Sequence, residues 1–211
     1  MSSARTRVKL CGMQDPSDVQ AAVAAGADAV GVINEITVES SREVSTSIAQ
    51  RVLEATPLFV TGVLVTMPRT VGDARASLDQ LNPDAIQIHG DLSRDETAEI
   101  AESYAVIRAF DVAESDAIVA HDGVVDALLI DSTDERGAGG TGHTHDWGRT
   151  RSYVEELETP VILAGGLTPE NVGEAIDQVQ PYGVDVASGI EGPSGKEPAA
   201  MAQFVASTGG V

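Results

Sequence analysis

The chain has 211 residues and a formal net charge of −20, from 33 acidic and 13 basic residues. Hydrophobic residues make up 42% of the chain, enough for one domain over residues 1–211, while aromatic residues are only 3%. So negative a chain argues against partners such as nucleic acid or an anionic membrane. No apolar run approaches the ~20 residues that span a bilayer, and the first residues lack the apolar stretch of a signal peptide.

The excess of acidic residues has three explanations: a basic partner, disorder, or a surface adapted to high salt. The acids are dispersed among regular apolar segments, which is not typical of a disordered chain. The only lysines are Lys9 and Lys196. In 1 M salt, repulsion between carboxylates is screened within about 3 Å. We therefore interpret the composition as that of a protein from an extreme halophile.

The chain has one cysteine, Cys11. A single cysteine excludes an internal disulfide and a cysteine-based metal cluster. This usage suits a reducing compartment, and we expect a cytoplasmic protein.

Short β-branched or apolar runs alternate with stretches rich in Ala, Glu and Gln, which predicts alternating strands and helices. The expected strands are residues 7–11, 29–33, 58–65, 85–88, 106–110, 127–131, 161–164 and 183–186. The expected helices are residues 16–25, 45–55, 71–81, 94–103, 114–120, 149–157, 169–179 and 197–206. Asp15 and Thr168 each precede a proline at a first helical position, and Ser93 with Glu96 has the spacing of a capping box.

Eight strands, each followed by a helix and with no linker between them, predict one α/β domain closed as a (βα)8 TIM barrel. The alternative is an open doubly wound sheet. Against this alternative, no G-x-G-x-x-G follows the first strand, where a dinucleotide-binding fold would carry it.

Two residues with chemical potential end predicted strands, Cys11 the first and Asp131 the sixth. Barrels of this kind do chemistry at the carboxyl ends of their strands, so the pair could serve as base and acid. Alone, a cysteine is more often a small buried hydrophobe, and Asp131 could cap a helix or turn. Lys9 lies two residues earlier, about 7 Å lower along the strand, so we do not expect it to act directly on Cys11.

Glycine-rich loops follow the sixth, seventh and eighth strands, over residues 137–142, from Gly165-Gly166 and from Ser188-Gly189. The last two lie where barrels bind phosphate on backbone N–H groups, and their alternative is a pair of tight turns. Arg42 could clamp a second anion or pair with a surface acid, and His89 could be a ligand or a loop residue. His143 and His145 share a loop with Asp146, a weak pattern for a metal site, and we expect no metal.

Taken together, seven segments resemble the phosphoribosylanthranilate isomerase family in order along nearly the whole chain. They are VKLCG (8–12), GADAVG (26–31), QIHG (87–90), LIDS (129–132), GGTG through DW (139–147), LAGGLTPENV (163–172) and VDVASGIE (184–191). The resemblance implies a single-domain (βα)8 barrel. It also implies an Amadori rearrangement of N-(5-phosphoribosyl)anthranilate to 1-(2-carboxyphenylamino)-1-deoxyribulose 5-phosphate, in tryptophan biosynthesis.

The resemblance assigns roles by position. Asp131 matches the general acid that protonates the furanose oxygen and opens the ring to an iminium. Cys11 matches the general base, which as thiolate takes the proton from C2 to give an enolamine that becomes the ketone. An ordinary thiol has a pKa of about 8.5, so a base near neutral pH needs surroundings that lower it. Neither step needs a metal or redox cofactor.

The resemblance also implies a phosphorylated small-molecule substrate, with Arg42 on the anthranilate carboxylate. The implied substrate-binding residues are Arg42, His89, Gly140, Gly142, Gly165, Gly166, Ser188 and Gly189. The chain departs from the family in loop 34–42, which lacks an aromatic-Pro-Lys-Ser pattern. It departs also at His143 and His145, where Lys and an aromatic residue are common, and at Ala187, where Ser is common.

Three alternatives stay open. One is another sugar-phosphate isomerase or epimerase. An epimerase would need metal-binding His and Asp residues at several strand ends, and only His89 is suitably placed. An indole-glycerol-phosphate synthase would need catalytic lysines there. A non-catalytic barrel that binds a phosphorylated metabolite would need neither Cys11 nor Asp131. The sequence leaves open a monomer or a homodimer, and a histidine-pathway aminoaldose as a second substrate.

We predict that folding and activity fail at low salt, because the carboxylates then repel one another without screening. Dialysis from molar KCl into dilute buffer should lower both Tm and turnover. An unchanged Tm and full activity in dilute buffer would contradict the halophilic interpretation.

Overall fold

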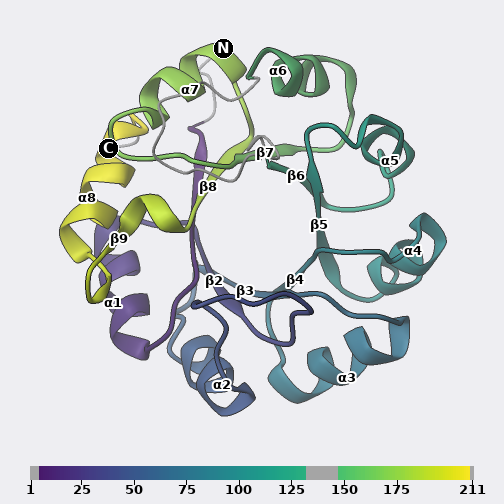
Figure 1. Ribbon diagram of the computed structural model, residues 1–211, viewed down its shortest axis with the longest axis horizontal. Coiled ribbons are helices and arrows are strands. Elements are labelled where there is room, and N and C mark those ends of the chain that lie inside the picture. Colours follow the sequence, from purple (N-terminus) through teal and green to yellow (C-terminus); the bar gives the residue numbers. More distant parts are fainter. Residues whose placement is uncertain (1–4, 132–146, 210–211) are drawn as a thin grey trace.

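The computed structural model describes residues 5–131 and 147–209. Eight parallel strands close into a barrel in chain order, with helices packed around it, as Figure 1 shows in a view down the barrel. The strands are β1 (Arg7–Cys11), β2 (Ala29–Ile33), β3 (Thr61–Thr66), β4 (Ala85–Ile88), β5 (Ala105–Asp111), β6 (Ala127–Asp131), β7 (Val161–Ala164) and β8 (Gly183–Val186). The (βα)8 prediction is confirmed.

The helices alternate with the strands. They are α1 (Pro16–Ala25), α2 (Thr46–Glu54), α3 (Val71–Leu81), α4 (Arg94–Ala101), α5 (Ser115–Ala120), α6 (Trp147–Glu156), α7 (Val172–Val179) and α8 (Pro198–Ser207). After β8 come a 3-10 turn, η1 (Ser188–Ile190), and a small hairpin of β9 (Glu191–Gly192) and β10 (Gly195–Lys196), which the sequence did not predict. In the part of the chain that the structure describes, no helix is long and apolar enough to cross a membrane.

The predicted bounds of β3 are wrong at its start, since the strand begins at Thr61 and not at Leu58. The segment before it forms a turn, in which the Val60 N–H donates to the Pro57 carbonyl at 3.2 Å. Phe59 has a φ of 73°, a left-handed conformation that no strand contains. The prediction began too early because residues 58–60 continue the apolar run of the strand but lie outside the barrel.

The predicted N-caps at Asp15 and Ser93 are confirmed, each with a complete capping box. The predicted cap at Thr168 is wrong, because α7 begins at Val172 with Asn171 as its N-cap. The Asn171 side chain accepts a hydrogen bond from the Thr168 N–H at 2.8 Å. This local bond makes residues 168–171 a turn in place of a first helical turn.

Side chains of the strands alternate between the barrel interior and the layer under the helices. Small and branched residues such as Ala109, Leu129 and Ile162 form one interior cluster. Cys11 belongs to a second, with Val63 among its members. The layer between strands and helices contains larger side chains, so the barrel wall is packed on both faces.

Three carboxylates fix the amino ends of neighbouring strands. Each precedes an even-numbered strand and accepts a hydrogen bond from the backbone of the strand before it: Asp28 from Val8, Asp84 from Gly62 and Asp126 from Val106, at 2.7–2.8 Å. These acids are structural, because they satisfy backbone donors at the end of the barrel away from the chemistry.

Candidate functional site

The structure brings the candidate residues to the carboxyl end of the barrel. Cys11 ends β1, Asp131 ends β6 and His89 follows β4, while Arg42 lies in the loop after β2. The loops after β7 and β8 carry the other described candidates, Gly165, Gly166, Ser188 and Gly189. Gly140, Gly142, His143 and His145 lie outside the described residues, so their predicted roles stay predictions. Among residues 5–131 and 147–209, no three His, Cys, Asp or Glu side chains are grouped to hold a metal ion.

Cys11 is a buried free thiol, 4% exposed, opposite Gly31 of β2. A Cβ atom on Gly31 would lie 2.8 Å from the Cys11 Sγ and 3.2 Å from the Lys9 Nζ. Both atoms therefore occupy the space that the missing side chain leaves. The expectation that Lys9 lies too low to reach Cys11 is wrong, because the long lysine stem carries its ammonium up the barrel wall.

Lys9 is held by Asp185, its register partner on β8, through an Nζ to Oδ1 ion pair of 2.8 Å. Burial acts to lower the pKa of Lys9, but attraction to Asp185 and Cys11 outweighs it and raises the pKa. The pKa of Cys11 is also raised, because burial penalises the thiolate, with Asp185 adding to the rise and the Lys9 and Lys196 ammonium groups opposing it. The thiol thus does not have the lowered pKa that the sequence interpretation required.

Arg42 is bound by a carboxylate of its own chain. Its Nε and Nη2 donate to the two oxygens of Glu191 at 2.6 and 2.7 Å. Lys196, whose side chain is 1% exposed, donates to the same carboxylate and to the Ala187 carbonyl, both at 2.8 Å. The hydrogen bonds that Arg42 donates to Glu191 are the main cause of a raised pKa at Arg42.

This cluster lies against the end of β1. A Cβ atom on Gly12, the residue after Cys11, would lie 3.0 Å from the Arg42 Cδ and 3.3 Å from the Lys196 Nζ. Gly12 has a φ of 81°, so glycine suits both the backbone and the contact. Two cations share one carboxylate here, which leaves one positive charge beside the thiol.

His89 contacts Gln87, with 2.7 Å between the side-chain Nε2 atoms. Burial, followed by repulsion from Lys9, lowers the pKa of His89 to about 4. The ring is therefore neutral at pH 7. With Gln87 as donor to Nε2, the proton lies on Nδ1, where it can be donated to a ligand.

A cavity of about 320 Å³ lies on the β4 to β6 side of the barrel mouth. His89 and the partly buried Asp131 line it, with Phe110 and Met67 as apolar walls. A carboxylate and a neutral imidazole thus face one space, at the opposite side of the mouth from Cys11 and Arg42.

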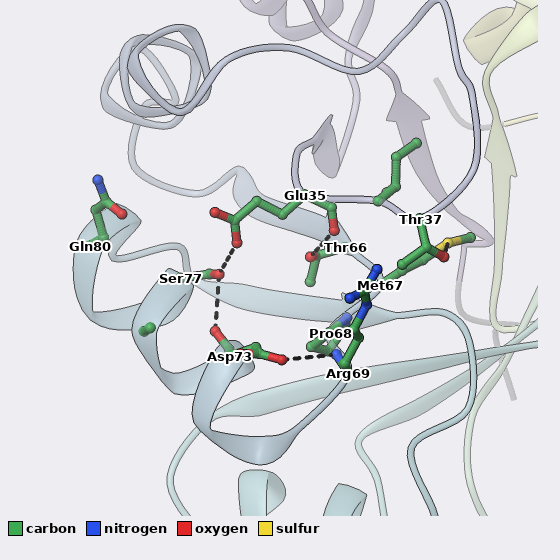
Figure 2. A pocket seen from close by; sticks show the side chains of 11 residues that line it. Glu35, Thr37, Thr66, Met67, Pro68, Arg69, Asp73, Ser77 and Gln80 are labelled. Carbon is green, nitrogen blue, oxygen red and sulfur yellow. Dashed lines mark hydrogen bonds between the residues drawn. The ribbon is translucent and has the colours of Figure 1, made fainter.

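A second cavity, of about 360 Å³, lies outside this group (Figure 2). It is formed by the loops after β2 and β3 and by α3, where Glu35 accepts a hydrogen bond from Ser77 at 2.6 Å. Neither Cys11 nor Asp131 lines it. Its size alone does not make it the catalytic cavity.

The loops after β7 and β8 are in direct contact. Gly165 and Gly166 have φ of 95° and 59°, and glycine adopts such values without strain. A Cβ atom on Gly189 would lie 2.0 Å from the Leu167 carbonyl oxygen. Because only glycine allows this approach, the two loops form one backbone surface at the carboxyl ends of β7 and β8.

The sequence interpretation missed Lys9, Asp185, Glu191, Lys196 and Gln87 as parts of the site. One signal was available. The chain has only two lysines, and both are in this group. A residue type that is rare in the chain is informative at the few positions where it occurs. The ion pairs themselves join residues far apart in sequence, such as Arg42 and Glu191, which no local pattern connects.

A closed (βα)8 barrel with a thiol, a carboxylate and cationic side chains at one mouth is typical of enzymes that move protons on small substrates. Comparison with known proteins agrees. The family model N-(5'-phosphoribosyl)anthranilate (PRA) isomerase matches residues 8–207. The N-(5'-phosphoribosyl)anthranilate isomerase of Halobacterium salinarum is 52% identical over 207 residues, 95% of this chain and 94% of that protein.

Two solved structures are similar over the whole barrel. One contains monomers generated from the dimeric phosphoribosylanthranilate isomerase of Thermotoga maritima, with a TM-score of 0.82 and 28% identity over 98% of this chain and 100% of that chain. The other is a phosphoribosylanthranilate isomerase in complex with reduced 1-(o-carboxyphenylamino)-1-deoxyribulose 5-phosphate, with a TM-score of 0.84 and 30% identity over the same shares. The chain belongs to the PRA isomerase family, whose reaction is a step of tryptophan biosynthesis.

We predict that His89 makes stability depend on pH. Its pKa in the folded protein, about 4, lies below the ordinary value of 6.5. The stability gained from the neutral ring is therefore complete above pH 6.5 and is lost as the pH falls toward 4. The stability advantage of the wild type over His89→Gln should shrink by up to about 3 kcal/mol across this range. Urea unfolding in molar KCl at pH 7 and pH 4.5 measures this, and equal pH dependence of both proteins would contradict it.

Proposed function

We propose that Cys11 and Asp131 are the base and acid of the isomerisation. Asp131 protonates the furanose ring oxygen, and the ring opens to an iminium. The Cys11 thiolate then takes the proton from C2 to give an enolamine, which gains a proton at C1 and loses the proton of its C2 hydroxyl as C2 becomes the ketone. The observation that carries the proposal is their placement at the carboxyl ends of β1 and β6, on opposite sides of one barrel mouth.

The raised pKa of Cys11 is compatible with this role. Fewer molecules carry a thiolate at neutral pH, but each thiolate is a stronger base. Turnover should therefore increase as the pH rises toward the pKa of the thiol, because the fraction of molecules with a thiolate increases. The Lys9 and Lys196 ammonium groups near Cys11 favour the thiolate and so oppose the effect of burial on ionisation.

Arg42 binds the anthranilate carboxylate in this proposal, and that carboxylate competes with Glu191 for the guanidinium. The bidentate pair with Glu191 presents Arg42 in the geometry that a carboxylate requires. Lys196 holds Glu191 when the substrate arrives, since it donates to one of the same oxygens. The single excess positive charge of the cluster is then matched by the carboxylate of the substrate.

The phosphate group binds at the joined loops after β7 and β8. Gly165, Gly166, Ser188 and Gly189 offer backbone N–H groups there, as is common in barrels of this type. Such a site needs no basic side chain, which suits a chain with 13 basic residues. His89 donates from Nδ1 to the sugar between the two anionic ends.

A cytoplasmic location is part of the proposal. Its support is the single cysteine, which is a free thiol and which the reaction uses in its reduced form.

We predict that the variants fall into two classes. Cys11→Ala and Asp131→Asn should each lose most of kcat, about 100-fold or more, and still bind the reduced product analogue. Arg42→Met should mainly raise KM and weaken binding of the analogue. Fluorescence of freshly generated phosphoribosylanthranilate in molar KCl measures turnover, and calorimetry measures binding. A near wild-type kcat for Cys11→Ala or Asp131→Asn would make its assigned role wrong.

We also propose that the chain forms a homodimer, and not a monomer. The support is the α2–β3 loop, where Leu58 is 89% and Phe59 102% exposed. Side by side on a charged surface, they offer an apolar contact that a second copy can bury. Sedimentation in molar KCl should give a dimer for the wild type and a monomer for Phe59→Asp. A monomeric wild type would overturn the proposal.

A further inference from the structure

Both lysines of the chain are buried around the same thiol. Lys9 is 4% exposed, and the Lys196 side chain is 1% exposed. The other cations of this 211-residue protein are arginines and the terminal amine. Burial of an ammonium group costs free energy unless the group is paired. The only two lysines of this chain are nevertheless both buried.

The Lys9 ammonium is fixed beside the Cys11 sulfur. Cys11 and Lys9 are two residues apart on β1 and point to the same side. Their Sγ and Nζ converge over Gly31, and Asp185 holds the Nζ from the neighbouring strand at 2.8 Å. The ammonium therefore has a fixed position on the sulfur side of the barrel interior.

We propose that Lys9 is a positioning residue that stabilises the thiolate of Cys11, and that Asp185 sets the place of its ammonium. Lys9 stays protonated throughout, and the thiol releases its proton to solvent before the substrate binds. The inference rests on the proposed role of Cys11 as base.

The other charges that face Cys11 do not replace Lys9. Arg42 comes from the loop after β2, Lys196 from β10 and Asp185 from β8. Of the three, Asp185 opposes the thiolate, and Arg42 and Lys196 are both engaged by Glu191. Lys9 is the largest of the influences that lower the pKa of Cys11. Without Lys9, burial and Asp185 would both act against ionisation.

The single cysteine allows a direct test. Protein labelled with ¹³C at the cysteine Cβ gives one signal, whose shift with pH reports the pKa of Cys11 without any need for turnover. The variants are Lys9→Met, Lys9→Arg, Asp185→Asn and the double variant Lys9→Met/Asp185→Asn. Arg75→Met is the matched control, since it removes one positive charge from an exposed ion pair with Glu99.

We expect Lys9→Met to raise the pKa of the thiol, so that the thiolate fraction at neutral pH falls about tenfold. Lys9→Arg should restore much of it. Asp185→Asn should lower the pKa, because the amide Oδ1 can still accept the Lys9 hydrogen bond while the negative charge that opposes the thiolate is removed. Arg75→Met should leave it unchanged. The rise of kcat with pH should shift with the pKa in each variant, while KM changes little.

Should Lys9→Met fail to fold, the double variant keeps the test, since it leaves no unpaired carboxylate in the barrel. A folded Lys9→Met with the wild-type thiol pKa, or a folded double variant with the same thiol pKa as Asp185→Asn, would overturn the inference, because the two proteins in each comparison differ only at Lys9. A Cys11→Ala variant with wild-type kcat would instead overturn the role of Cys11 as base, whatever the titration gives. The two failures are thus distinguishable.

Discussion

The pairing of β1 with β8 places Lys9 beside Asp185 and closes the barrel. The site depends on this closure, because β1 supplies Cys11 and the segment after β8 supplies Glu191 and Lys196. Arg42 and Glu191 meet across a separation of 149 residues in the sequence. In an open sheet these groups would be far apart. Barrel formation and assembly of the site are therefore one event.

Charge is distributed in two opposite ways in this molecule. The chain as a whole carries −20, which repels an anionic substrate at low salt and is screened at high salt. At the barrel mouth, in contrast, Lys9, Arg42 and Lys196 gather around one thiol. Buried ion pairs contribute little net stability because of their desolvation cost. They place a fixed positive potential beside Cys11, where the proposed thiolate and the proposed carboxylate subsite both require one.

Local patterns predicted most of the architecture. The bounds of six strands follow from runs of apolar residues, and the N-caps at Asp15 and Ser93 follow from side chains that bond their own helix. The predicted bounds were wrong where a contact or a backbone torsion that the sequence pattern does not contain fixed the start of an element. Phe59 is apolar, but its backbone has a left-handed conformation, so β3 begins only after it. Asn171 bonds to the Thr168 N–H and delays the start of α7.

The sequence by itself determined the (βα)8 fold, the placement of Cys11 and Asp131 at strand ends, and the family, because periodicity and motif order are properties of neighbours along the chain. Only the tertiary structure decided which charges meet. It placed Lys9 against Cys11, gave Arg42 the carboxylate of Glu191, and raised the pKa of a thiol that was expected to have a lowered one. Burial and the distance between charges depend on packing in three dimensions, and spacing along the chain contains neither.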